Sequence, residues 1–336
     1  MIARGTSKEH MAIAAQTPVP TPKGFILASD LKPGGYIFNP EGVPNQILSV
    51  QSYVAPDCYE AHFDDGLTIE GDRHMAFMLQ TRAYRDQQAR WFKNRNSQFA
   101  KRLRRPLEKR TLAELAKEDL TLERGHAKYT LQTTGPLQYP HVDLPVPPYV
   151  FGLWIGSLAP SGHHWLKNDD FNSMQKKVRA VGFNLVRRRH RWGYSVEFFI
   201  RPSVRESFTV AGAPIPDIIP QSYLEADVDS RMALLDGLRD ARNITESKLN
   251  PGQFMIRDAW RGIRRKQQLV EGLGMVSRLM KCDTETKYEL VFRLRHENCA
   301  KTRRKIRKIA KKSAQMCVHV ETEAGFVAGE GFIAVC

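Results

Sequence analysis

Cysteine and histidine are the residues of this 336-residue chain that could carry nucleophilic and proton-transfer chemistry. The cysteines are odd in number and lack C-x-x-C spacing, so they fit neither a disulfide framework nor a zinc site, and we expect free thiols. They are Cys58, Cys282, Cys299, Cys317 and Cys336. For Cys317 and His74 a catalytic role competes with a structural one, because a buried cysteine commonly packs as a small hydrophobe and a single histidine is commonly a satisfied polar residue.

Positive charge is the strongest compositional signal. The chain holds 51 Lys and Arg against 36 Asp and Glu, a formal net charge of +15. Cations that displace counterions from phosphates supply much of the nonspecific affinity for nucleic acid, which is therefore the first candidate partner.

Membrane insertion and secretion are not expected. No apolar run approaches the length of about 18 residues that a membrane-spanning helix needs. Residues 1–15 lack the continuous apolar segment of a signal peptide. These patterns predict a soluble cytoplasmic protein.

Short β-like runs separated by turn residues fill residues 17–78 and predict a compact all-β unit. The runs are Gly24–Leu27, Gly35–Phe38, Gln46–Val50, Tyr59–Phe63 and Leu67–Ile69. A basic insertion follows over 82–110, and Thr111 begins a capped helix. The proline-rich passage 135–148 resists regular structure, and β character returns from Cys317 to Val335.

Two apolar helix candidates, 149–156 and 232–239, each precede mixed helix and strand patterns of similar length, which favours an internal duplication. In the second half we expect a helix over 259–280, a strand over 288–295 and a basic amphipathic helix over 301–312.

Several motifs resemble those of inteins that carry a homing endonuclease. Residues 12–24 and 28–34 resemble the first intein block, and residues 66–74 resemble the block that ends in a histidine, here His74. Residues 317–333 resemble the late intein block, and residues 144–156 resemble the start of a LAGLIDADG endonuclease domain. The resemblance implies a mixed α+β multidomain chain, in which an all-β Hint fold formed by the two chain ends is interrupted by a pseudo-twofold α+β LAGLIDADG domain.

The resemblance also sets the expected boundaries. Residues 1–11 would be an N-terminal flank, 12–110 the first part of the Hint domain with its basic insertion, and 111–143 a linker. The two LAGLIDADG halves would be 144–225 and 226–312, and the Hint domain would finish over 313–336. A monomer with internal pseudo-twofold symmetry is expected, encoded by a phage or another mobile element.

The splicing positions implied by the resemblance depart from the usual pattern. Ala12 occupies the place of the common Cys or Ser nucleophile, which suits the class of inteins that uses a cysteine in the late block, here Cys317. That class expects a tryptophan where this chain has Ala76, and Gly71 replaces the usual threonine before His74. Because residues 333–336 contain no asparagine that could cyclise, we expect no complete splicing reaction.

The endonuclease positions depart in the same way. LAGLIDADG helices pack through small residues, a role that Gly152, Gly156 and Gly237 fit, and each helix ends in an acid that binds Mg²⁺ over the scissile phosphate. Here Ser157 and Arg242 stand at the two acid positions, so metal binding and cleavage are expected to be impaired. Asp240 is the first candidate substitute ligand, and Asp169 and Asp170 are the others.

Binding of a specific double-stranded DNA site does not depend on those acids, and it is the expected function. The residues expected to contact DNA form three clusters: Arg187, Arg188, Arg189 and Arg191; Arg261, Arg264, Arg265 and Lys266; and Arg303, Arg304 and Lys308. Two other hypotheses remain open. One is a splicing element with residual autoprocessing through Cys317, and the other is a catalytically inactive structural or regulatory protein.

Overall fold

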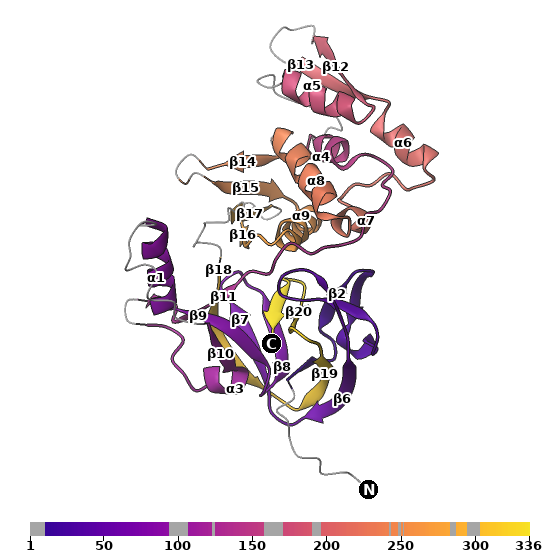
Figure 1. The fold of residues 1–336 in the computed structure, drawn as a ribbon. Coiled ribbons are helices and arrows are strands. Elements are labelled where there is room, and N and C mark those ends of the chain that lie inside the picture. Colours follow the sequence, from indigo (N-terminus) through magenta and orange to yellow (C-terminus); the bar gives the residue numbers. More distant parts are fainter. Residues whose placement is uncertain are drawn as a thin grey trace. The chain divides into compact units, whose positions relative to one another are not determined.

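The computed structural model describes residues 11–93, 107–122, 125–157, 171–189, 196–241, 243–247, 250, 252–282, 287–293 and 303–336. The chain is a mixed α/β protein that divides into two compact units. The first comprises Met1–Gln138, Gly274–Arg278 and Arg295–Cys336, and the second comprises Tyr139–Leu273 and Leu279–Leu294. Each unit has its own arrangement of strands and helices (Figure 1).

The first unit is built on a nine-stranded sheet in the order β10-β9-β11-β18-β7-β8-β1-β19-β6. These strands are β1 (Ala12–Ala14), β6 (Ser49–Ala55), β7 (Cys58–Phe63), β8 (Thr68–Asp72), β9 (Ala76–Thr81), β10 (Glu108–Thr111), β11 (Tyr129–Gln132), β18 (Arg303–Lys312) and β19 (Gln315–Glu321). Three two-stranded ribbons complete the unit: β2 (Pro18–Thr21) with β3 (Gly24–Leu27), β4 (Tyr36–Phe38) with β5 (Pro44–Gln46), and β20 (Phe326–Ala328) with β21 (Ile333–Val335). Its helices are α1 (Arg82–Lys93), α3 (Leu112–Leu115) and the 3₁₀ turn η1 (Ala28–Asp30).

Strands from the two chain ends interleave in that sheet, as the resemblance implied. In Figure 1 the yellow β19 lies among the indigo and purple strands of the N-terminal part. β19 is flanked by β1 on one edge and β6 on the other, both antiparallel to it. Neither end of the chain can therefore complete this sheet alone.

Local sequence explains several of these elements. Half-buried and buried residues alternate from Glu60 to Phe63 in β7, and Gly66 takes a positive φ of 84° in the turn to β8, a backbone conformation that favours glycine. The helix expected after Thr111 is confirmed, because the Thr111 hydroxyl accepts from the Glu114 N–H while the Glu114 carboxylate accepts from the Thr111 N–H.

The basic helix expected over 301–312 is wrong, because Arg303–Lys312 form strand β18. Arg304 and Ile306 are buried while Lys305 and Arg307 are exposed, so a period of two applies to the start of this segment. Pairing with β7 and β11 gives β18 two hydrogen-bonded neighbours. The strand belongs to the first unit, so the expected boundary after residue 312 differs from the observed one, which lies before Arg295.

The second unit contains two segments, each of which begins with a helix. The first has α4 (Pro148–Gly156), α5 (Phe171–Ala180), the hairpin β12 (Asn184–Arg189) and β13 (Val196–Arg201), α6 (Val204–Val210) and α7 (Gln221–Leu224). The second has α8 (Val228–Asp240), β14 (Ile244–Glu246), β15 (Gln253–Asp258), α9 (Trp260–Gly272), β16 (Ser277–Lys281), of which only the residues from Leu279 on belong to this unit, and β17 (Tyr288–Arg293). Its sheet has the order β14-β15-β17-β16.

One helix of the second unit is shorter than expected. The helix predicted over 259–280 ends at Gly272, and β16 occupies much of the remainder. Gly274 has a φ of 77°, which ends the helical conformation of the chain there.

The helices α4 and α8 pack closely through glycines, as expected. A Cβ atom on Gly152 would lie 2.3 Å from the carbonyl oxygen of Leu234, and one on Gly237 would lie 2.2 Å from the carbonyl oxygen of Tyr149. The two backbones therefore touch in both directions, which only residues without a side chain allow.

Candidate functional site

Five neighbouring strands of the first unit bring the late-block cysteine beside β1 and place a histidine opposite the first residue of that strand. Within the sheet, Ala12 is paired with His319 and Ala14 with Cys317. On the other edge of β19, Cys317 is paired with Tyr53 of β6. On the other edge of β1, β8 ends at Asp72, whose partner on β7 is Cys58. Because cross-strand partners share a face, Cys317 and Tyr53 lie side by side.

The peptide bond between Met11 and Ala12 is held at both of its polar atoms. The Ala12 N–H donates to Oδ1 of Asp72 at 3.1 Å. Nδ1 of His319 lies 2.7 Å from the Met11 carbonyl oxygen. Since a carbonyl oxygen only accepts, this contact requires the proton to be on Nδ1.

Asp72 is the centre of this arrangement and is only 2% exposed. Its Oδ1 also accepts from the backbone N–H groups of His74 at 3.1 Å and Met75 at 2.8 Å. Its Oδ2 accepts from the Tyr53 hydroxyl at 2.8 Å. Four donors on one carboxylate is the pattern of a charged acceptor.

The thiol of Cys317 is fully buried beside a second thiol. The Sγ atoms of Cys317 and Cys58 are 3.8 Å apart, and the Cys58 thiol donates to the Ala55 carbonyl oxygen at 3.4 Å. Burial first, and then Cys58 and nearby carboxylates, raise the pKa of the Cys317 thiol. The thiol is therefore protonated at neutral pH and needs a proton acceptor before it can attack a carbonyl carbon. Burial and then Asp72 likewise raise the pKa of Tyr53.

Two of the three splicing positions expected from sequence thus lie in one buried cluster, which contains Ala12, Ala55, Cys58 and Cys317 with Tyr53 packed against it. His74 contributes its backbone N–H to Asp72, and catalysis by its half-exposed imidazole stays a prediction. Asp72, Tyr53, Cys58 and His319 were missed. Asp72 and His319 stand within the matched blocks 66–74 and 317–333, but no local spacing marks their roles, because these depend on the register of the neighbouring strands.

The expected Mg²⁺ ligands of the second unit do not fit a metal. The Ser157 hydroxyl donates to the Trp154 carbonyl oxygen at 3.0 Å. Asp240 accepts from the Tyr149 hydroxyl at 2.8 Å and from Lys177 Nζ at 2.7 Å, so a cation already neutralises it. Within the described ranges, no three His, Cys, Asp or Glu side chains converge as a metal site would require. Arg242, Asp169 and Asp170 lie outside the described residues.

Two of the expected DNA contacts are buried instead. Arg304 is 5% exposed, ion-paired with Asp65, and donates to the Gly331 carbonyl oxygen at 2.9 Å. Lys266 is also 5% exposed and donates to Asp258 and Asn243, both at 2.7 Å. Burial of both side chains does not fit phosphate binding.

The other residues expected to contact DNA either have accessible or hydrogen-bonded side chains or have side chains that lie outside the described part of the structure. Arg261 and Lys308 are exposed, and Arg265 donates a hydrogen bond to the Gln221 side-chain oxygen. Arg264 donates to Gln267 and lies over the Trp260 ring at 5.6 Å. Arg187, Arg188 and Arg189 are residues of β12, and Arg303 begins β18, but their side chains lie outside the description, as does all of Arg191.

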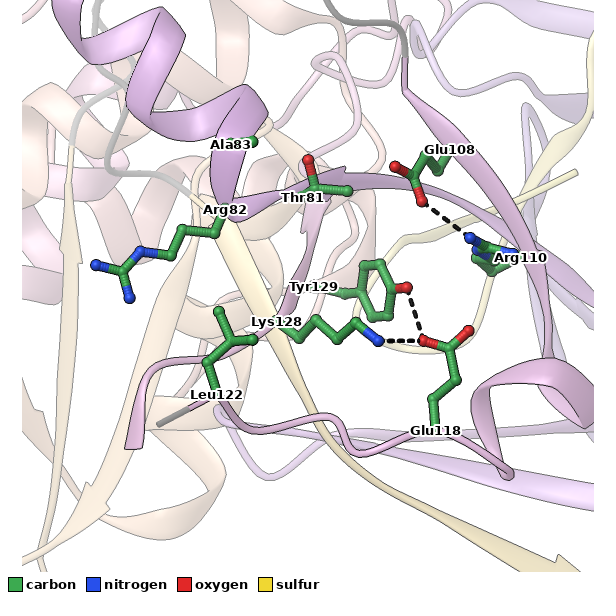
Figure 2. Close-up of a pocket in the computed structure, with 9 residues that line it drawn as sticks. All are labelled: Thr81, Arg82, Ala83, Glu108, Arg110, Glu118, Leu122, Lys128 and Tyr129. Atoms are coloured by element: carbon green, nitrogen blue, oxygen red, sulfur yellow. Dashed lines mark hydrogen bonds and ion pairs between the residues drawn. The ribbon is translucent and has the colours of Figure 1, made fainter. Parts of the chain in front are cut away.

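A surface pocket of about 450 Å³ lies beside α1, β9, β10 and β11 (Figure 2). In Figure 2 the Glu118 carboxylate lies between Lys128 and Tyr129, accepting from Nζ at 2.6 Å and from the hydroxyl at 2.7 Å. Arg110 is paired with Glu108 at 3.2 Å. The opposite charges in this pocket pair with one another, so its lining selects no particular ligand.

Comparison with known proteins gives limited similarity. No family model matches the sequence. The chain is 27% identical over 234 residues to the replicative DNA helicase DnaB of Mycobacterium intracellulare, which covers 68% of this chain and 37% of that protein. The chain thus spans little more than a third of this curated relative.

Among solved structures, the chain is similar to the MchDnaB-1 intein at 28% identity over 20% of this chain and 54% of that one, with a TM-score of 0.20. The Msm DnaB1 intein splicing domain bound with zinc is 28% identical to this chain, and the match covers 20% of this chain and 56% of that domain, also with a TM-score of 0.20. The gp41-1 intein is 18% identical to this chain, and the match covers 35% of this chain and 73% of that intein, with a TM-score of 0.23. TM-scores this low do not define the fold of this chain. Separately, none of the helices in the described part has the length and apolar character needed to cross a bilayer.

Proposed function

We propose that the first unit is a self-processing element of the intein type, which acts on its own Met11–Ala12 peptide bond with Cys317 as the nucleophile. One observation carries the proposal. Asp72 accepts from the N–H and His319 contacts the carbonyl oxygen of the same peptide bond, Met11–Ala12. This bond immediately precedes β1, and the neighbouring strand β19 carries the buried thiol of Cys317. The resemblance of residues 12–34, 66–74 and 317–333 to intein blocks supports the same conclusion.

The chemistry that we propose uses these groups as follows. Attack of Cys317 Sγ on the Met11 carbonyl carbon forms a C–S bond and places negative charge on the carbonyl oxygen, where the His319 N–H can stabilise it. Breaking the C–N bond then leaves Met11 joined to Cys317 as a thioester and releases Ala12 as an amine. Alanine at position 12 is compatible with this route, because the nucleophile comes from β19.

Thiolysis tests this proposal. Incubation of the full chain with dithiothreitol or hydroxylamine should release residues 1–11 from residues 12–336, as measured by intact mass. Cys317→Ala should abolish release. Cys282→Ala, which changes a half-exposed cysteine of the second unit, should leave the release rate unchanged. An intact chain after prolonged incubation of the unaltered protein would exclude the proposal.

Sequence-specific binding of double-stranded DNA by the second unit is a second candidate. It is favoured by the reciprocal contacts of Gly152 and Gly237, which suit paired LAGLIDADG helices. The four-stranded sheet also keeps Phe254, Ile256, Leu290 and Phe292 buried, so the alternate residues of β15 and β17, including Arg257 and Arg293, share the other face. A sheet face with cations suits contacts to base edges and phosphates, which on this face would replace the ion pair of Arg257 with Glu289 and the hydrogen bond from Arg293 to Gln253.

A mobility-shift assay against a target-site library tests DNA binding. Charge reversal of Arg257 and Arg293, or of Arg187, Arg188 and Arg189, should weaken binding, with Lys176→Glu on α5 as the exposed control. Unchanged affinity of the reversed variants would remove those surfaces from the proposal. Because the sequence has Ser157 and Arg242 at the two acid positions, discrete double-strand breaks in the presence of Mg²⁺ are not expected.

A further inference from the structure

The proposed cleavage needs a proton to move between two atoms. A protonated Cys317 thiol must lose its proton to form the C–S bond, and the nitrogen of Ala12 must gain one to leave as an amine. A single group close to both atoms could do both tasks without any external acid or base.

Asp72 touches the leaving nitrogen directly. Its Oδ1 accepts the Ala12 N–H at 3.1 Å, and the carboxylate is buried away from water. A group within hydrogen-bond distance of the reacting nitrogen meets the geometric requirement for proton transfer to it.

Asp72 is also joined to the thiol side of the cluster by two neighbours. Tyr53 is the cross-strand partner of Cys317, and its hydroxyl donates to Oδ2 of Asp72 at 2.8 Å. Cys58 is the cross-strand partner of Asp72, and its Sγ lies 3.8 Å from that of Cys317. The raised pKa of Cys317, to which Asp72 contributes, is consistent with this proximity.

The other titratable neighbours are less suited to this task. His319 Nδ1 is engaged with the Met11 carbonyl oxygen, the opposite end of the peptide bond. Among the described contacts of Asp72, His74 supplies only its backbone N–H. Tyr53 has a raised pKa, so its phenol is a weak acid, and its place is to orient the carboxylate.

We propose that Asp72 is the acid–base residue of the Met11–Ala12 cleavage, an assignment that rests on the proposed function. Its carboxylate takes the Cys317 thiol proton as the Sγ–C bond forms and gives it to the Ala12 nitrogen as the C–N bond breaks. The proton passes from sulfur to nitrogen, one bond forms and one breaks, and no oxidant or reductant takes part. Tyr53 is a positioning residue that fixes Oδ2.

The test compares release rates of residues 1–11 in dithiothreitol. Asp72→Asn keeps an oxygen for the three backbone donors but cannot carry the proton, so its rate should fall by about 100-fold or more. The control is Glu321→Gln. It removes a carboxylate on the same strand as Cys317, which accepts a hydrogen bond from the Ser49 hydroxyl, and this variant should cleave at the unaltered rate. Circular dichroism and thermal unfolding check that each variant retains its fold.

Three outcomes are decisive. An Asp72→Asn rate within about threefold of the unaltered chain, with the fold intact, would overturn the assignment while leaving the proposed function in place. If Asp72→Asn does not fold, Tyr53→Phe decides, because it retains the carboxylate and its backbone donors; a rate lowered beyond about threefold supports the assignment, and an unchanged rate overturns it. Failure of the unaltered chain to cleave would overturn the proposed function, and the assignment with it.

Discussion

Gly152 of α4 and Gly237 of α8 each face the backbone of the other helix, so the two helices touch without an intervening side chain. We expect Gly152→Ala to lower the free energy of unfolding of the second unit by about 2 kcal/mol, because the new methyl overlaps the Leu234 carbonyl oxygen and forces the helices apart. The higher helix propensity of alanine offsets only part of this loss. Urea unfolding measures it.

Lys176→Ala is the matched control for that substitution. Lys176 is exposed on α5, where replacement should change stability by no more than about 0.5 kcal/mol. Equal stability of Gly152→Ala and the control would mean that α4 and α8 are not in backbone contact.

Arg304 should be a structural cation of the first unit. Removing its partner by Asp65→Asn leaves a buried, uncompensated guanidinium, and we expect a loss of about 3 to 5 kcal/mol in unfolding free energy. Lys308→Ala, an exposed change in the same strand, should have little effect. Thermal unfolding compares them, and a stable Asp65→Asn variant would contradict the burial of this pair.

Alkylation should distinguish the thiols. Because burial raises the pKa of Cys317 and few thiolates form, iodoacetamide should modify it far more slowly than the half-exposed Cys282 at neutral pH. Peptide mass spectrometry over a time course follows each site. Modification of Cys317 before Cys282 would show that the thiol is accessible and ionised, contrary to the structure.

Acid should weaken the Glu118 network of Figure 2. The hydrogen bond from Lys128 holds the pKa of Glu118 below its ordinary value. This carboxylate therefore stabilises the folded chain at any pH above the ordinary pKa of a glutamate, and the stabilisation is lost as the pH falls through the lowered pKa. Glu118 likewise raises the pKa of Lys128, whose contribution is lost only at alkaline pH.

Melting temperatures of the unaltered chain and Glu118→Gln provide the measurement for this network. The difference between them should be largest near neutral pH and should shrink as the pH falls below the ordinary pKa of a glutamate, about 4.3, and through the lowered pKa that Glu118 has in the folded chain. A difference that stays constant over this range would show that the ion pair does not contribute.

Sequence predicted the parts of the structure that depend on local pattern. The strand runs at Gly24–Leu27 and Tyr59–Phe63 and the capping box at Thr111 are encoded by neighbouring residues. β18 was mistaken for a helix because its lysines and arginines suit a helix surface, and only its pairing with β7 and β11 makes it a strand.

The candidate site divides in the same way. Ala12 and Cys317 were found through motifs. Tyr53 and His319 depend on the register of β19 with strands more than 200 residues away, and Asp72 depends on the register of β8 with β1 and β7. One-residue shifts in that register would turn these side chains to the opposite face, and no local pattern reports it.

The position of β19 near the C-terminal end of the sequence also determines when the first unit can be completed during synthesis. A ribosome makes β1, β6 and β8 early, then the whole second unit, and only afterwards the strand that carries Cys317 and His319. Until β19 is inserted between β1 and β6, the N-terminal strands lack a central neighbour and the Met11–Ala12 bond has neither its thiol nor its histidine. Under the proposed function, a chain that ends before β19 cannot cleave itself, and the second unit is synthesised before the Met11–Ala12 bond meets its nucleophile.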